Sequence, residues 1–350
     1  MTKNIEKFRN NRTYWLDIWT KDFIGLAPDE PLTREAIELD QVEKLNRLFS
    51  YVREKSPFYR ELYKDFPEDM VFTSVKDIEK LPLTSPADLV AHESDMLCVN
   101  PKEISRIVTL PTSGTTGVPK HVSFTPEDQQ LTVDHFRYGM QYLTDKNGKV
   151  LVLLPHDRPG SVGTLLAEAV RLLGAEATFD PADTGITCVV GLPTFIAKMA
   201  LASKGQPRSD GKPGTRAEEM KETVVSVLLT AEYVSRENAE IISSTWDCMP
   251  FEHYGMTEMG LGGAVTCNML DGFHIREHGL LFEIIDPETG EVLPDGQTGE
   301  VVFTTLNRKG MPFIRYRTGD VASILDRPCR CGSVSRCLTR VGDRAMKKGG

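Results

Sequence analysis

The stretch LPTSGTTGVPK occupies residues 110–120 and combines four hydroxyl side chains, two glycines and a terminal lysine. It follows a β-branched run at residues 107–109, which predicts a strand that leads into a glycine-rich loop. Glycines let backbone N–H groups turn toward an anion, hydroxyls add donors, and Lys120 adds a compact positive charge. A solvated surface turn needs none of these groups. The stretch therefore predicts a phosphate-binding loop, and it is no Walker loop, because Gly117 is followed by Val118 and Pro119.

The composition is that of an ordinary globular protein, since 40% of the 350 residues are hydrophobic and 8% are aromatic. The net charge of −9 offers no basic surface for nucleic acid or an anionic membrane, so small molecules are the expected partners. No apolar run approaches membrane-spanning length and the first residues lack the apolar core of a signal peptide, so we expect a cytoplasmic protein. Seven cysteines, mostly dispersed, argue against a disulfide framework.

Continuous apolar runs at residues 150–154, 188–190 and 224–229 predict buried strands. Helical stretches at 163–173 and 194–202 separate them, which is typical of a parallel sheet covered on both faces. We therefore expect an α/β fold, with mostly parallel sheets covered by helices and a smaller β-hairpin subdomain toward the C-terminus.

The regions before and after this α/β core show other sequence patterns. Helical periodicity predicts helices at 33–55, capped by Thr33, and at 57–64, whereas beyond Gly279 the pattern predicts strands at 280–286, 300–306 and 313–316. We expect four segments: a helical lead-in packing on the core at 1–100, an α/β nucleotide- and acyl-binding core at 101–278, a β subdomain with a cysteine cluster at 279–339, and a hinge at 340–350.

Two further motifs follow the glycine-rich loop, EHYGMTE at residues 252–258 and IRYRTGD at 314–320. In this order the three motifs resemble those of the AMP-forming acyl-adenylate synthetases, and within them the phenylacetate-CoA ligase and coenzyme F390 synthetase group. The resemblance runs from about Gln41 to the end. It implies the large domain of that fold, ATP, AMP, Mg²⁺ and CoA as cofactors, and a carboxylic acid substrate, aryl by family default, that becomes an acyl-AMP and then a CoA thioester.

The resemblance also implies residue roles. Glu258 resembles the magnesium carboxylate rather than a solvated surface acid, Thr257 would lie near the α-phosphate, and Asp320 resembles the ribose-binding acid rather than a turn residue. We expect Lys120 to act in catalysis together with Thr257 and Glu258. The family's own catalytic lysine is a different residue, which belongs to the C-terminal domain. Tyr254 would stack near adenine, Ala231 and Glu232 occupy the place of the family's adenine-side turn, and Arg340 matches the arginine that reaches the ribose. The remaining nucleotide-binding residues implied are Thr112, Ser113, Gly114, Thr115, Thr116, Gly117, His253, Gly255 and Met256.

For the acid, His156 resembles the residue that borders the acyl pocket, with a packed or solvated histidine as the alternative. Gly262 and Gly263 would let the acyl group approach the backbone, unless they are simply loop glycines. These residues do not identify the acid.

The end of the chain departs from the family pattern, because Thr339 and Gly342 replace the glycine and the first aspartate of the hinge motif. Family members continue into a small mobile C-terminal domain, which we expect to be absent here, and we expect weak turnover with retained ATP or acyl-AMP binding. The alternatives to an active ligase are a non-catalytic nucleotide or acyl-adenylate-binding module and a half-enzyme that needs a separate C-terminal domain. The sequence does not decide whether the chain forms a homodimer.

A cysteine and histidine set predicts a structural zinc site. Cys329 and Cys331 lie where they can meet Cys267 and His274, which would supply a Cys₃His set, and the same pattern recurs in the family that the chain resembles. Cys337 could replace one ligand. The alternative is a group of free, partly buried thiols beside a surface histidine.

Overall fold

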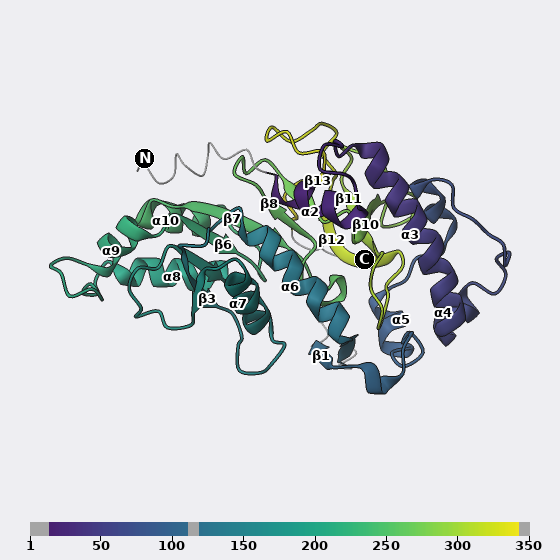
Figure 1. The fold of residues 1–350 in the computed structure, drawn as a ribbon, viewed down its shortest axis with the longest axis horizontal. Helices are drawn as coiled ribbons and strands as arrows, with labels where there is room; N and C mark the ends of the chain where they lie inside the picture. Colours follow the sequence, from purple (N-terminus) through teal and green to yellow (C-terminus); the bar gives the residue numbers. More distant parts are fainter. Residues whose placement is uncertain (1–13, 111–118, 343–350) are drawn as a thin grey trace.

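The computed structural model describes residues 14–110 and 119–342. An eight-stranded sheet runs through the molecule in the order β13-β9-β8-β7-β6-β5-β3-β4 (Figure 1). Its parallel part, from β4 to β7, confirms the predicted parallel sheet, whereas β7, β8, β9 and β13 pair antiparallel. The strands are β3 (Lys149–Leu153), β4 (Glu176–Thr178), β5 (Cys188–Gly191), β6 (Ser226–Leu229), β7 (Met249–Tyr254), β8 (Ala264–Thr266), β9 (Phe273–Ile275) and β13 (Cys337–Leu338).

Successive residues of these strands supply two different cores. Val150 and Val152 of β3 pack with residues of α6 and α7, whereas Leu151 packs with residues of α8 and α10. Both faces are therefore apolar, which explains why the strands read as continuous apolar runs. The helices are α6 (Pro126–Met140), α7 (Val162–Leu172), α8 (Pro193–Ser203), α9 (Arg216–Thr223) and α10 (Arg236–Trp246).

Residues of α3, α4 and α5 share one core with the second sheet, which is antiparallel in the order β10-β11-β12 (Figure 1), whereas Leu16 and Trp19 of α2 pack in the core with α6 and α7. As predicted, Thr33 caps α3, where its hydroxyl accepts a hydrogen bond from the Ala36 N–H at 3.2 Å. The remaining elements are α2 (Trp15–Ile24), α3 (Arg34–Lys55), α4 (Pro57–Leu62), η1 (Val75–Lys80), α5 (Pro86–Ala91), η2 (Pro101–Glu103), β1 (Arg106–Leu110), β2 (Lys120–Phe124), η3 (Thr257–Met259), β10 (Leu280–Ile285), β11 (Gly299–Thr305) and β12 (Tyr316–Ala322).

One predicted strand was wrong. The strand expected at 313–316 lies instead at Tyr316–Ala322, because Arg315 adopts a positive φ of 49° that interrupts extended backbone before Tyr316. The segment boundaries drawn from the sequence stay predictions. In the part of the chain that the structure describes, no helix is long and apolar enough to cross a membrane.

The carboxyl ends of the parallel strands set the place of a site. β6 ends at Leu229 and is followed by Thr230, while β7 ends at Tyr254 and is followed by the turn that carries Glu258. Adjacent parallel strands end at the same edge of a sheet, and ligands of open α/β sheets bind outside that edge. Residues far apart in the sequence therefore meet there.

Candidate active site

Lys120 and Glu258 form a buried ion pair between the first two motifs. Lys120 Nζ lies 2.6 Å from Glu258 Oε1, and the side chains are 15% and 1% exposed. Tyr316 of β12 donates its hydroxyl to the same carboxylate oxygen at 3.3 Å. The interpretation of Glu258 as a solvated surface acid is therefore wrong. A buried carboxylate beside the lysine that ends the predicted phosphate-binding loop fits the hard-oxygen preference of Mg²⁺.

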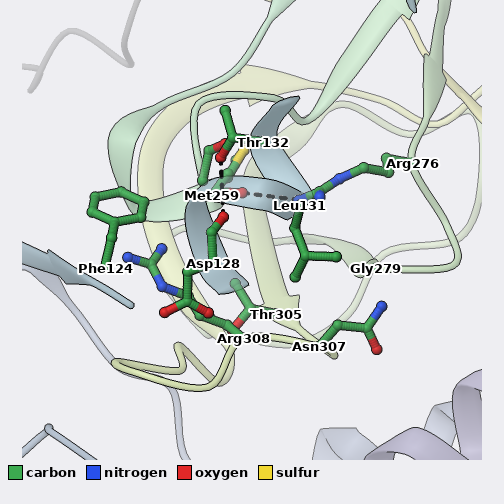
Figure 2. A pocket seen from close by; sticks show the side chains of 11 residues that line it. Phe124, Asp128, Leu131, Thr132, Met259, Arg276, Gly279, Thr305, Asn307 and Arg308 are labelled. Carbon is green, nitrogen blue, oxygen red and sulfur yellow. Dashed lines mark hydrogen bonds between the residues drawn. The ribbon is translucent and has the colours of Figure 1, made fainter. Parts of the chain in front are cut away.

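Three side chains outside the motifs hold the turn that carries Glu258. Arg308 donates to the Glu258 carbonyl at 2.7 Å, Arg276 donates to the Met259 carbonyl at 3.0 Å, and Thr132 of α6 donates to the Gly260 carbonyl at 2.9 Å. Three successive carbonyls are thus anchored from three separate elements. Figure 2 shows the pocket where Thr132, Arg276 and Arg308 gather around Met259.

Both arginines are buried at some electrostatic cost. Burial and the neighbouring Arg308 charge lower the pKa of Arg276 to about 10, and burial also lowers the pKa of Arg308. The Arg308 guanidinium lies over the Phe124 ring, 4.3 Å from its centroid, which offsets part of the lost hydration. Neither arginine could be identified from the sequence, because neither stands in a motif and their burial depends on partners far along the chain.

Tyr254 and Asp320 join the second and third motifs. The Tyr254 hydroxyl donates to Asp320 Oδ2 at 3.0 Å, and Asp320 lies inside β12 rather than in a turn. The turn-acid interpretation of Asp320 is therefore wrong. Its carboxylate stands beside the aromatic residue predicted to stack on adenine, and the ribose-binding and stacking roles stay predictions.

The predicted adenine-side residues lie along the same edge. Ala231 has a φ of 66°, a left-handed conformation that non-glycine residues seldom adopt, and Glu232 accepts a hydrogen bond from Thr194 at 2.6 Å. Arg340 reaches back to this region, where it donates to the Val234 carbonyl at 2.7 Å and to Glu252 Oε1 at 2.9 Å. The structure thus brings the second motif, the 230–234 segment and the start of the predicted hinge together.

Other predicted residues fall at the edge of the site or outside the described residues. Gly255 and Met256 link β7 to Thr257, the first residue of η3. Thr112, Ser113, Gly114, Thr115, Thr116 and Gly117 lie outside the residues that the structure describes.

An apolar cavity lies beside His253. Its cavity volume is about 40 Å³, and α6, α7 and strands β5 to β8 supply its walls. Predicted His156 is not among the described residues that line it, since the ring is exposed and stacks on Phe179 at 4.0 Å. A Cβ on Gly262 would lie 1.8 Å from Cδ2 of His135, so Gly262 makes room for that ring. The acyl-binding roles of His156, Gly262 and Gly263 stay predictions.

The cysteine and histidine set comes together as predicted. One ligand atom from each of Cys267, His274, Cys329 and Cys331 lies within 4.8 Å of every other, and all four residues are buried. The histidine is therefore no surface residue. Cys337 of β13 pairs in register with His274 of β9 but does not belong to this group.

The cysteines outside this set and Cys337 are packed thiols. Cys98, Cys188 and Cys248 are free and buried. Burial raises the pKa of the Cys98 and Cys188 thiols to about 12, which keeps them protonated and unreactive.

Comparison with known proteins settles the family. Residues 56–307 match the AMP-binding enzyme family. This chain is a member of that family. The chain is 30% identical over 325 residues to a phenylacetate-coenzyme A ligase of Thermus thermophilus, and the match covers 87% of this chain and 69% of the relative. It is 28% identical over 340 residues to a phenylacetate-coenzyme A ligase of Pseudomonas putida, covering 91% and 72%.

A solved structure shows the same fold. The open conformation of 2-hydroxyisobutyryl-CoA ligase in complex with 2-HIB-AMP and CoA superposes on this AMP-binding enzyme with a TM-score of 0.76 at 18% identity, covering 91% of this chain and 74% of that one. Together these matches confirm the predicted class, an AMP-forming acid–CoA ligase that resembles the phenylacetate-CoA ligases, and the predicted α/β fold.

Proposed function

We propose that the chain activates an organic acid, with an aryl acid such as phenylacetate as the first candidate, by adenylation at the site around Glu258. The carboxylate oxygen of the acid attacks the α-phosphorus of ATP and forms the acyl–O–P bond. The bond to the bridging oxygen breaks, and pyrophosphate leaves with the electron pair. The CoA thiolate then attacks the acyl carbon, and AMP leaves with its oxygen.

The observation that carries this proposal is the convergence of the three motifs, through the Lys120–Glu258 pair and the Tyr254–Asp320 hydrogen bond. Lys120 offers positive charge to the phosphates, the Asp320 carboxylate offers acceptors to ribose hydroxyls, and Tyr254 offers an aromatic face to adenine. Thr257 lies next to Glu258, within the turn that Arg308 and Arg276 anchor. Pre-positioned groups of this kind supply most of the catalysis in phosphoryl-group chemistry.

Glu258 is the residue that would hold Mg²⁺, which supplies charge neutralisation on the phosphate oxygens when bound. Lys120 occupies one oxygen of that carboxylate in this structure. Lys120 therefore lies beside the carboxylate that would hold the ion, where its charge is also available to the phosphates.

Pyrophosphate release from ATP tests the proposal. The purified chain is assayed with a panel of aryl and alkyl acids, with and without CoA, and Glu258→Gln is compared with Glu176→Gln, a change in an exposed ion pair. We expect acid-dependent release that CoA increases and that only Glu258→Gln abolishes. ATP binding without release for any acid would point instead to a nucleotide-binding module and contradict the proposal.

We also propose that Cys267, His274, Cys329 and Cys331 hold a structural zinc ion. In a tetrahedron, Zn–S bonds of about 2.3 Å and Zn–N bonds of about 2.0–2.1 Å set neighbouring ligand atoms about 3.5–3.8 Å apart. The Cys267 and Cys329 sulfurs lie 3.7 Å apart, and the Cys331 sulfur lies 3.4 Å from His274 Nε2. Metal analysis should find one equivalent of zinc, which Cys329→Ser removes and Cys188→Ser does not. Purified, folded chain without stoichiometric metal would contradict it.

A further inference from the structure

Tyr316 contacts the carboxylate that would hold Mg²⁺, although it belongs to the third motif. Its hydroxyl donates to Glu258 Oε1 at 3.3 Å, and Lys120 Nζ donates to the same oxygen at 2.6 Å. No described residue donates to Oε2 of Glu258, so the two donors leave that oxygen for the ion. A group that binds one oxygen of a metal-binding carboxylate orients the other oxygen, and contacts of this kind govern metal affinity in many proteins.

The hydroxyl of Tyr316 is held in place by the packing of its ring. The residue is fully buried, and its ring packs against those of Phe303 and Phe313, with centroids 5.5 Å and 5.0 Å away. Burial and the Glu258 charge raise the pKa of Tyr316 well above its usual value, so the hydroxyl keeps the proton that it donates. Glu258 therefore receives a hydrogen bond from a fixed, protonated donor.

The backbone directly before Tyr316 has a conformation that non-glycine residues seldom adopt, because Arg315 has a φ of 49°. The Arg315 guanidinium is buried, where it donates to the two oxygens of Glu283 at 2.8 Å and 3.2 Å and to the Leu81 carbonyl at 2.7 Å. Strained backbone persists only where the surroundings over-determine it, and it clusters at functional sites. Here the strained residue immediately precedes the donor to Glu258.

We infer that Tyr316 is a positioning residue, which holds the Glu258 carboxylate in the orientation that binds magnesium. The inference rests on the proposed function, since it deepens the ion-binding role proposed for Glu258. The third motif then serves the site twice from one strand, β12: Asp320 is proposed for the ribose, and Tyr316 acts on the ion-binding carboxylate.

The effect of magnesium on nucleotide binding tests the inference without turnover. The probe is α,β-methylene-ATP, in which carbon replaces the bridging oxygen that must leave. It is titrated calorimetrically without and with Mg²⁺, and the ratio of the two Kd values measures what the ion contributes. Tyr316→Phe, which keeps the ring and removes the hydroxyl, should lower that ratio about fivefold and leave the Kd without Mg²⁺ unchanged. The effect should be no larger because 3.3 Å is long for a hydroxyl donor.

Two comparisons separate positioning from packing. Tyr142→Phe removes another buried hydroxyl, which accepts a hydrogen bond from the Leu16 N–H at 3.2 Å, and should leave the ratio unchanged. Glu258→Gln should lower the ratio at least as far as Tyr316→Phe does. The double variant should lower it no further than Glu258→Gln alone, because Tyr316 acts through that carboxylate.

The inference is overturned by a ratio of one in the unaltered chain, or by a ratio that Tyr316→Phe or Glu258→Gln leaves unchanged. An equal loss in Tyr142→Phe, or a further loss in the double variant, would also overturn it, because either result assigns the hydroxyl a packing role. If the ratios behave as expected but no acid releases pyrophosphate, the proposed reaction fails and the inference about Tyr316 stands.

Discussion

Replacing Lys120 by methionine removes the cation from a carboxylate that is 1% exposed, and this should destabilise the chain markedly. Breaking a buried ion pair from one side costs about 3–5 kcal/mol, and we expect about 3 kcal/mol, because Lys120 itself retains 15% exposure and Tyr316 still donates to Glu258. At about 2 °C per kcal/mol for a chain of this size, Tm should fall by about 6 °C.

Thermal unfolding followed by circular dichroism measures the effect, with Lys149→Met as the matched control. The Lys149–Glu176 pair has a similar separation of 2.8 Å, but Glu176 is 61% exposed, so its loss should cost at most about 1 kcal/mol. The double variant Lys120→Met with Glu258→Gln should lose about 2 kcal/mol less unfolding free energy than the two single variants lose together. Equal effects at Lys120 and Lys149, or strict additivity, would refute the buried-pair argument.

Three further predictions follow from the site. Arg308→Met should lower kcat by tenfold or more with a small change in the KM for ATP, because the Glu258 turn loses an anchor; steady-state pyrophosphate assays check this, and unchanged kcat would contradict it. Tyr254→Phe should weaken nucleotide binding modestly, by about 1 kcal/mol, through loss of its hydrogen bond to Asp320; calorimetric titration with ATP measures it, and an unchanged Kd would count against that contact. The folded-state pKa of His253 is lowered to about 4, so the unfolded chain binds more protons than the folded chain between about pH 4 and 6.5. The free energy of unfolding should therefore fall as pH drops through that range, by up to about 1.4 kcal/mol per pH unit. In His253→Phe the dependence of Tm on pH should be shallower, and an unchanged slope would exclude His253 as its source.

The sheet and its helices could be predicted from the sequence because their causes are local. Residues 150–154 read as a continuous apolar run since both faces of β3 are covered, and Thr33 precedes its helix with a hydroxyl in capping position. The strand near residue 316 could not be placed, because the conformation of Arg315 is imposed by distant partners: its guanidinium binds Glu283 at 2.8 Å and the Leu81 carbonyl at 2.7 Å.

In the candidate site, too, some residues could be predicted from local sequence and others depend on distant partners. Lys120, Glu258, Tyr254 and Asp320 stand in motifs, and the structure brings them together in pairs. His135, Arg276 and Arg308 carry no local signal, because each is a polar residue whose burial arises only once α6 and the segments after β9 and β11 have met. Sequence patterns therefore predicted the motif residues that face one another, but not the side chains that hold them or line the apolar cavity.

The largest core also has a consequence for how the chain folds as it leaves the ribosome. Leu45 and Phe49 of α3 share that core with Phe282 of β10 and Phe303 of β11, more than 200 residues later, and the Tyr59 hydroxyl donates to the Pro312 carbonyl. The parallel sheet, by contrast, is complete in sequence once β7 has been made. The first helices must therefore wait, with their apolar face uncovered, until synthesis has passed β12, and this interval is when we expect the nascent chain to depend most on chaperones.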